Sequence, residues 1–360
     1  MPDVFKFFAP EESCLGVDIG TTSIKIVEVK KGKERPEFVN YAYLESSGYL
    51  ARANQALQTS SLKLFESEVA EFLKVALYEL KPQTKDAFAS LPPFAAFIAA
   101  LDFPDMSPGE VQKSLAFQAK QYIPMPVSEV AIDWVKAGDF EDDKGFKHQE
   151  VLLVSVPKEQ IIRYQRLFKL VGLNLKSLEI ESLSLARILS AGDPTPTVIV
   201  DIGSRSTNIV FVENGQLKFN SQSDFAGASL TQALSSSLSI NPLRAEELKK
   251  ERGIVGVGPN YELSTLMLPF LDAIINEVKK AEYAYRNQFP SLAKVERVVL
   301  SGGGANLLGI EKYFAGEFNL PVVKAAPLTR FNYKPEVEPV VAELNPIMSV
   351  ALGLTFKAGF

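Results

Sequence analysis

The chain has 360 residues, and 38 basic against 43 acidic side chains give a formal net charge of −5. This balance argues against a generally basic nucleic-acid binder. Hydrophobic residues make up 46% of the chain and charged residues 22%, which is ordinary globular composition and excludes bulk disorder. The length predicts about two domains.

The cysteine and histidine content excludes several kinds of site. Cys14 is the single cysteine and His148 the single histidine, so an internal disulfide, a cysteine zinc cage and a multi-histidine metal site are ruled out. No apolar run approaches the roughly 20 residues that a membrane-spanning helix needs. The N-terminus lacks the marks of a signal peptide, so we expect a cytoplasmic protein. Within it, Val4–Phe8 is expected to pack on the body as an arm, with a membrane or partner anchor as the alternative.

Two segments of the sequence match without gaps at an offset of 183 residues. Leu15–Gly32 reads LGVDIGTTSIKIVEVKKG, and Val198–Gly215 reads VIVDIGSRSTNIVFVENG. Each segment has the pattern of a strand, a tight turn and a second strand, with a glycine turn that closes the next hairpin. A period this long indicates two related lobes that open with the same unit.

Both turns combine glycine with hydroxyl residues and follow an aspartate at a strand end, Asp18 or Asp201. Glycine lets backbone N–H groups point inward and the hydroxyls add donors, so such a loop can cradle a phosphate. The aspartate can hold a hydrated Mg²⁺. One copy alone is more simply an ordinary hairpin, but two copies in register favour a polyphosphate held from both sides.

Between the two repeats, the periodicity predicts a series of alternating helices and strands. Apolar spacing predicts a helix over 65–80 and a strand over 87–91. Residues 94–171 then predict a small α+β unit. Its elements are a strand at 94–101, a helix at 111–122, strands at 130–135 and 150–156, and a helix at 158–170.

Two further elements follow the second repeat. Val295–Ile310 reads VERVVLSGGGANLLGI, an apolar strand and three glycines, after which we expect an amphipathic helix starting near Asn306. We interpret this loop as the adenosine side of a nucleotide site. In Asn241–Gly253, Glu246 and Lys249 lie three residues apart on one helix face. Alone they are most simply a solvated ion pair. Together with the two repeats and the glycine loop, the helix is a candidate to close over the ribose and base.

These four elements, in this order, resemble the nucleotide-binding superfamily of actin, Hsp70 and the sugar kinases. Within it the chain is similar to the FtsA-like branch, and most closely to the PilM family of cytoplasmic proteins in type IV pilus assembly. The motifs DIGTTSIKIVEV, DIGSRSTNIV and LSGGGANLLGI carry the superfamily, and LPPFAAFIAALDFP with FQAKQYIPMPVSEVAIDW carries the family. The resemblance covers essentially the whole chain. It implies an α/β, two-lobed actin-like ATPase fold with an FtsA-like inserted α+β subdomain.

The resemblance also implies a site for ATP and Mg²⁺ that draws on both lobes. The first phosphate loop would contain Asp18, Gly20, Thr21, Thr22 and Lys25, the second Asp201, Gly203, Ser204, Ser206 and Thr207, the adenosine loop Gly302, Gly303, Gly304 and Asn306, and the capping helix Glu246 and Lys249. Asp18 and Asp201 would be the metal ligands. Glu181 would orient the water for hydrolysis, with Glu179 as a shifted alternative, and we expect ATP turnover to be slow or absent.

The pattern divides the chain into four parts. Lobe one takes 1–93 and 172–196, and 94–171 forms the inserted subdomain. Lobe two takes 197–233 and 294–360, with its own insertion at 234–293 that includes the capping helix and a long helix over 263–289.

For function, the resemblance implies a nucleotide-dependent switch that acts as an assembly scaffold at the inner membrane. Its partner would be the short N-terminal cytoplasmic tail of a PilN-like membrane protein, docked on the inserted subdomain and the adjacent lobe one. Other pilus proteins would be further partners, and self-association stays open. Two alternatives remain: an FtsA-like cell-division protein, whose C-terminal amphipathic helix we do not find after Gly353, and a small-molecule kinase, for which no substrate motif is evident.

Overall fold

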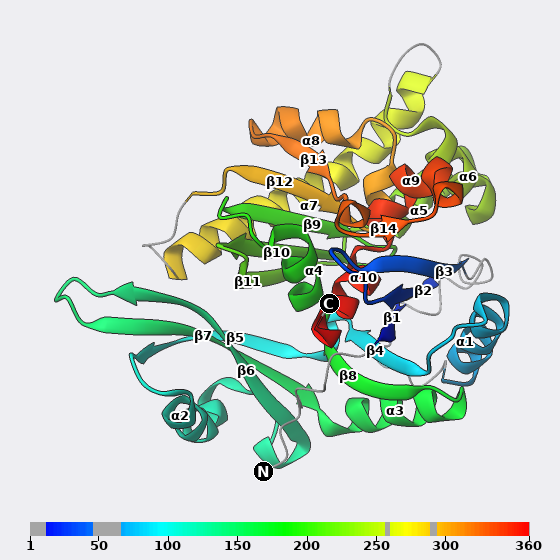
Figure 1. Cartoon of the computed structure of the whole chain (residues 1–360). Coiled ribbons are helices and arrows are strands. Elements are labelled where there is room, and N and C mark those ends of the chain that lie inside the picture. Colours follow the sequence, from blue (N-terminus) through cyan, green and yellow to red (C-terminus); the bar gives the residue numbers. More distant parts are fainter. Residues whose placement is uncertain (1–11, 46–65, 256–259, 289–293, 360) are drawn as a thin grey trace.

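Three β-sheets organise the residues that the computed structural model describes, which are 12–45, 66–255, 260–288 and 294–359 (Figure 1). The predicted arm Val4–Phe8 therefore lies outside the described residues. Two of the sheets belong to the two lobes and the third belongs to the inserted subdomain.

The six-stranded sheet of lobe one has the order β14-β3-β2-β1-β4-β8. Its strands are β1 (Ser13–Ile19), β2 (Ser23–Lys30), β3 (Glu37–Glu45), β4 (Asp86–Leu91), β8 (Asn174–Ile180) and β14 (Asn332–Tyr333). Two helices bury their apolar stripes in the same core as β1 and β4, namely α1 (Glu66–Leu80) and α3 (Lys158–Leu170). The expected helix at 158–170 therefore contributes to lobe one, through the buried residues Tyr164, Leu167 and Phe168.

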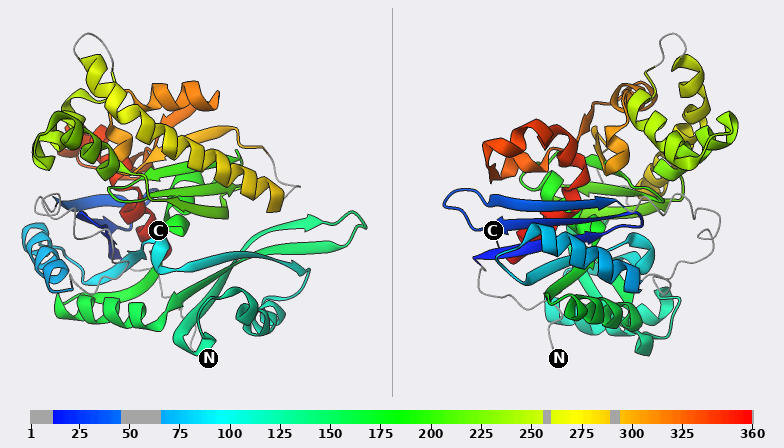
Figure 2. Two further views of the ribbon diagram at one scale, coloured as in Figure 1. Left: turned by 180° about the vertical axis from the view of Figure 1, so that it is seen from behind. Right: turned by 90° about the vertical axis from the view of Figure 1, so that its right-hand side faces the viewer.

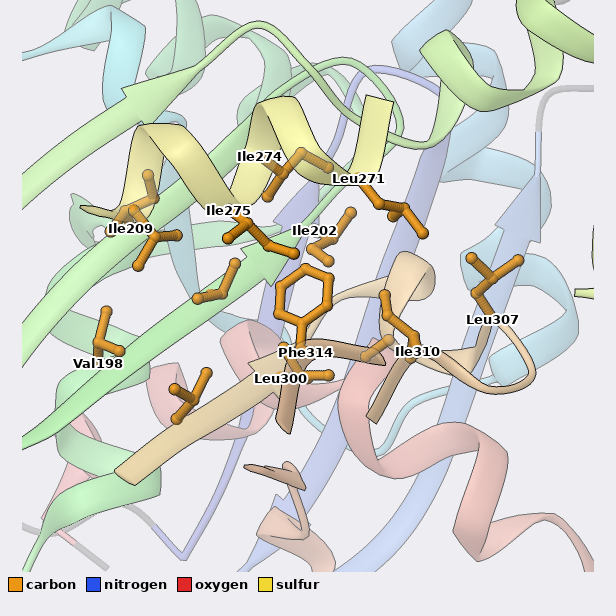
Figure 3. Packing of buried hydrophobic residues seen from close by; sticks show 14 of the residues in the cluster. Val198, Ile202, Ile209, Leu271, Ile274, Ile275, Leu300, Leu307, Ile310 and Phe314 are labelled. Atoms are coloured by element: carbon orange, nitrogen blue, oxygen red, sulfur yellow. The ribbon is translucent and has the colours of Figure 1, made fainter. Parts of the chain in front are cut away.

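The five-stranded sheet of lobe two has the order β11-β10-β9-β12-β13. Its strands are β9 (Thr197–Ile202), β10 (Thr207–Glu213), β11 (Gln216–Ser223), β12 (Arg297–Ser301) and β13 (Val322–Lys324). Helices α5 (Gly227–Leu238), α7 (Asn260–Gln288) and α8 (Ile310–Phe318) pack on it, and α6 (Pro242–Arg252) packs against α5. Figure 3 shows Phe314 of α8 between Leu300 of β12 and Ile275 of α7, at the centre of this core.

Both lobe sheets share one topology. In each, three antiparallel strands follow one another and two later strands add in parallel beyond the first, giving β3-β2-β1-β4-β8 and β11-β10-β9-β12-β13. Asn214 and Gly215 close the second hairpin with positive φ angles of 51° and 74°, as the glycine turn predicts. The internal repeat in the sequence is therefore a repeat in the fold.

The inserted subdomain is a three-stranded antiparallel sheet with the order β5-β7-β6, covered on one face by α2 (Pro108–Tyr122). Its strands are β5 (Phe97–Pro104), β6 (Val130–Glu141) and β7 (Lys147–Pro157). The first strand begins three residues later than predicted, because Pro93–Ala95 forms a 3₁₀ turn that starts directly after Pro92. The β6–β7 hairpin projects from the body (Figures 1 and 2).

The end of the chain returns from lobe two to lobe one. Strand β14 pairs with β3, and α10 (Ser349–Thr355) packs on α4 (Glu181–Ser190) and on β1. Glycine permits this close contact, since a Cβ at Gly353 would lie 2.3 Å from the carbonyl oxygen of Ser184. The predicted lobe-two range 294–360 therefore includes residues that complete the core of lobe one.

Within the described part of the chain, no single helix is long and apolar enough to cross a membrane.

Candidate nucleotide site

The first predicted phosphate loop is a tight turn between β1 and β2. The backbone N–H of Gly20 donates to the carbonyl oxygen of Ser23 at 2.9 Å. Asp18 and Lys25 face each other across the strand pair, with 3.0 Å between Asp18 Oδ2 and Lys25 Nζ. Ser90 Oγ of β4 donates to the other carboxylate oxygen of Asp18 at 2.8 Å. The aspartate is thus fixed in place by a lysine and a hydroxyl, both on neighbouring strands.

The second loop repeats this turn in lobe two. The N–H of Gly203 donates to the carbonyl oxygen of Ser206 at 3.0 Å. The start of α5 then packs on the loop, because Gly227 N–H donates to the Gly203 carbonyl and Ala228 N–H to the Ser204 carbonyl. Thr207, predicted to contact phosphate, is fully buried, and its hydroxyl donates to the carbonyl oxygen of Phe225 at 2.7 Å. The hydroxyl of Thr207 therefore holds the loop to the segment before α5 and is not directed at a ligand.

The predicted adenosine loop lies against the end of β9. A Cβ at Gly302 would lie 2.5 Å from the Ile202 carbonyl oxygen, and one at Gly304 would lie 2.3 Å from the Ile202 side chain. Close approach to β9 therefore requires these two glycines, whereas Gly303 has open space beside it. Asn306 Nδ2 donates to the Glu343 carbonyl oxygen at 2.9 Å.

The helix expected to start near Asn306 begins instead at Ile310. A 3₁₀ turn, η5 (Gly303–Asn306), follows the glycines, and Gly309 with a φ of 90° then sets the direction of α8. The sequence pattern does not distinguish this 3₁₀ turn from the first turn of the helix. The predicted start was therefore too early.

The capping helix α6 lies beside the second loop. Lys249 Nζ donates to Glu246 Oε2 at 2.5 Å, to Thr231 Oγ1 at 2.9 Å and to the carbonyl oxygen of Gly227 at 3.1 Å. Burial lowers the pKa of Lys249, with the Glu246 carboxylate acting in the opposite direction. The predicted pair is therefore a partly buried network that joins α6 to the first turn of α5.

Three carboxylates from both lobes act on one lysine. Burial alone would lower the pKa of Lys25, but the Asp18, Asp201 and Glu181 carboxylates outweigh it and raise that pKa. Burial raises the pKa of Glu181 well above its usual range, and Asp18 and Asp201 raise it further. Burial also raises the pKa of Asp201 to about 6, against the effects of the Ser301 hydroxyl and Lys25. The excess of negative charge suits a cation.

Glu179, the shifted alternative to Glu181, is engaged in structural ion pairs. Its side chain is 1% exposed and forms ion pairs with Arg187 at 2.6 Å and Lys357 at 3.1 Å. These contacts join β8 to α4 and to the C-terminal segment. Glu181, as the first residue of α4, is left as the carboxylate that faces Asp18 and Asp201.

The carboxylates fit a magnesium ion that is shared with a ligand. Among the residues described, no group of three or more His, Cys, Asp or Glu side chains is arranged as a metal cage. Mg²⁺ in nucleotide sites usually takes one or two carboxylates and completes its shell with water and phosphate oxygens. Asp18 and Asp201 are the residues that would hold it in that manner.

Several functional neighbours carry no signal in the sequence. Ser90 and Ser301 contact the two aspartates, yet each is a single hydroxyl in an ordinary strand. Lys250 of α6 pairs with Glu45 at the end of β3, with 3.1 Å between Nζ and Oε2, and this contact joins the two lobes. Such contacts depend on the packing of distant segments, so no local pattern predicts them.

Comparison with known proteins finds a similar family and a similar solved structure. A family profile described as "Type IV pilus assembly protein PilM" matches residues 16–358. A solved structure of a "PilM-PilN type IV pilus biogenesis complex" contains a similar chain, with a TM-score of 0.81, 20% identity, and coverage of 97% of this chain and 99% of the other.

More distant solved structures share the fold alone. The ethanolamine utilization protein EutJ from Carboxydothermus hydrogenoformans has a TM-score of 0.54 and 15% identity, over 98% of this chain and 91% of the other. MreB 5 of Spiroplasma citri bound to AMPPNP has a TM-score of 0.53 and 13% identity, over 96% and 95%. The expected actin-like α/β fold is confirmed.

Proposed function

Because the chain belongs to the PilM family of type IV pilus assembly proteins, we propose that it is an ATP-binding scaffold of that machinery. In this proposal ATP with Mg²⁺ bridges the two lobes, and its presence sets how closely they approach. The observation that carries the proposal is the charge arrangement of Asp18, Glu181 and Asp201 around Lys25, between two turns of the same geometry. The family match favours this function over cell division or small-molecule phosphorylation.

Each loop has a part in holding the nucleotide. The N–H groups of the two glycine turns, with Thr21, Thr22, Ser204 and Ser206, would contact the phosphates from opposite sides. Lys25 would neutralise phosphate charge, and Gly303 would leave room for the adenosine. The carboxylates of Asp18 and Asp201 would hold Mg²⁺, which would supply positive charge against the phosphates.

Turnover would depend on Glu181. A raised pKa favours the protonated carboxyl group, which is a poor base for the attacking water. Mg²⁺ near Asp18 and Asp201 would offset part of the negative charge that raises this pKa. Slow hydrolysis suits a switch, because the bound state then persists.

A thermal-shift titration tests nucleotide binding. We expect Mg-ATP to raise the melting temperature of the wild type, since a ligand that binds the folded state stabilises it. Asp18→Asn should reduce this shift strongly, while Asp139→Asn, in an exposed ion pair with Lys136, should keep it. A wild-type protein that shows no shift at millimolar Mg-ATP would contradict the proposal.

The partner we propose is a short membrane-protein tail like that of PilN, which the similar solved structure names. Support comes from α3, which follows β7 of the inserted subdomain and packs in lobe one. Ile162 and Leu170 on this helix are exposed apolar side chains, at 44% and 60%. A peptide with apolar side chains would cover them and remove that surface from water.

Peptide titration of point variants tests this docking site. Deleting 94–171 is unsuitable, because it also removes Tyr164 and Phe168 from the core of lobe one. Ile162→Asn should weaken binding of a labelled tail peptide at least tenfold, whereas Tyr283→Asn, at an exposed position on α7 of lobe two, should leave it unchanged. Equal affinities for the two variants would place the docking site elsewhere.

A further inference from the structure

The inserted subdomain packs on lobe two as well as on lobe one. Leu152 and Val154 of β7 share a core with Val212 of β10 and Leu217 of β11. Ala100 of β5 packs against the main core of lobe two. Strand β11 is the edge of the lobe-two sheet, so the inserted sheet covers that edge.

A buried ion pair crosses this contact. Lys218 Nζ of β11 lies 3.3 Å from Glu150 Oε2 of β7, and the two side chains are 6% and 4% exposed. Gly138 lies at a β-bulge in β6, and a Cβ there would lie 2.4 Å from Lys218 Nζ. Lys218 therefore extends from lobe two into the inserted subdomain, where the absence of a side chain at Gly138 leaves space for its Nζ.

The surroundings of the pair carry further negative charge. Glu213 at the end of β10 has one buried carboxylate oxygen without a hydrogen-bond partner. Burial raises the pKa of Glu150, Lys218 lowers it, and Glu213 and Asp102 raise it again. Burial raises the pKa of Tyr285 on α7, and the charges of Glu213 and Glu150 raise it further. Lys218 is thus the cation that compensates the buried carboxylate of Glu150. Without Lys218, that carboxylate would be buried without a counter-ion, which is strongly destabilising.

We propose that Glu150 and Lys218 form a clasp that makes the inserted subdomain follow lobe two when the lobes move. The contact between the inserted sheet and lobe one, where α3 begins, would then open or close with the angle between the lobes. A partner bound at α3 would in this way sense the nucleotide. The lobe movement rests on the proposed nucleotide function, but the clasp itself does not.

Hydrogen exchange of the full chain tests the clasp without any ligand. Lys218→Met should speed exchange at least tenfold in β5, β6, β7 and β11 and leave β1 and β2 unchanged. The double variant Glu150→Gln with Lys218→Met removes both charges and should recover much of the protection. Lys136→Met is the control, because that lysine is in an exposed ion pair on the same subdomain. If Lys218→Met behaves like Lys136→Met, the clasp is overturned.

The pH dependence of stability gives a second test of the Glu150–Lys218 pair. It can be used even if Lys218→Met folds poorly. Protonation of Glu150 relieves the unpaired charge in Lys218→Met, so this variant should regain melting temperature as the pH falls, and the double variant should not. Glu150→Gln alone should also show faster exchange on both sides of the contact, in β7 and in β11. Parallel pH profiles for the single and double variants would also refute the clasp.

Addition of Mg-ATP tests the coupling. Where a thermal shift shows that ATP binds, exchange in β6 and β7 should change in the wild type and not in Glu150→Gln. An unchanged wild type with ATP bound overturns the coupling. If ATP does not bind at all, the proposed nucleotide function fails, and the ligand-free exchange still decides the clasp.

Discussion

Gly20 and Gly203, 183 positions apart, make the same hydrogen bond in their separate lobes. Each donates its N–H to the carbonyl oxygen of the serine three residues later, at 2.9 Å and 3.0 Å. The positions across each strand pair differ, because Asp18 faces Lys25 whereas Asp201 faces Asn208. The two turns therefore share their backbone geometry, but only the first has a lysine opposite its aspartate.

The second glycine turn should be the more sensitive to substitution. A Cβ at Gly203 would lie 2.8 Å from the Ser206 carbonyl oxygen, so Gly203→Ala must open the turn. We expect ATP affinity to fall at least tenfold with little change in the fold, measured by titration calorimetry. Gly109→Ala has open space around it and should bind ATP as the wild type does. Unchanged affinity in Gly203→Ala would show that the turn does not contact phosphate.

Asp201 should make the ligand-free protein less stable as the pH rises. Burial raises its pKa from 3.8 to about 6, so the folded state binds the proton more tightly than the unfolded state does. The free energy of unfolding therefore falls between pH 4 and pH 6, by up to about 3 kcal/mol at pH 7. Asp201→Asn should match the wild type near pH 4 and exceed it at pH 7. Denaturant unfolding across this range measures the difference, and parallel curves would contradict it.

The contact between α10 and α4 should tolerate no added atom. Gly353→Ala places a Cβ 2.3 Å from the Ser184 carbonyl oxygen, and we expect a loss of about 2 kcal/mol or more in unfolding free energy. Gly316→Ala is the matched control, since that glycine is exposed in α8 with no atom nearby. It should gain roughly 0.5–1 kcal/mol from helix propensity. Equal effects of both variants in urea unfolding would mean that the helix pair can separate freely.

The ion pair between Glu45 and Lys250 should act on kinetics more than on stability. Both side chains are about half exposed, at 49% and 54%, so the pair contributes at most about 1 kcal/mol. Since it joins β3 to the capping helix, Lys250→Met should speed release of a fluorescent ATP analogue several-fold in stopped-flow experiments. The difference from wild type should shrink at high salt. Lys280→Met, in an exposed pair on α7, should release the analogue at the wild-type rate.

The sequence predicted those parts of the fold that are written in local patterns. The repeat placed both hairpins, and apolar spacing placed α1, α2 and α3 to within a few residues. It could not assign α3 to the core of lobe one, because an amphipathic stripe does not say which sheet it covers. The same holds for Ser90 beside Asp18 and for the cations on Glu179, which come from segments far away in the sequence.

Strand β14 and helix α10 also bear on how the chain folds on the ribosome. The strands of lobe two lie within one continuous stretch, from Thr197 to Lys324, so this sheet can close as soon as that stretch has emerged. Strand β3, in contrast, waits for its neighbour β14, which is synthesised roughly 15–60 s later at ordinary elongation rates. The sheet of lobe two can therefore be complete before that of lobe one, and the β3 edge stays open to chaperones or to wrong pairing until β14 has emerged.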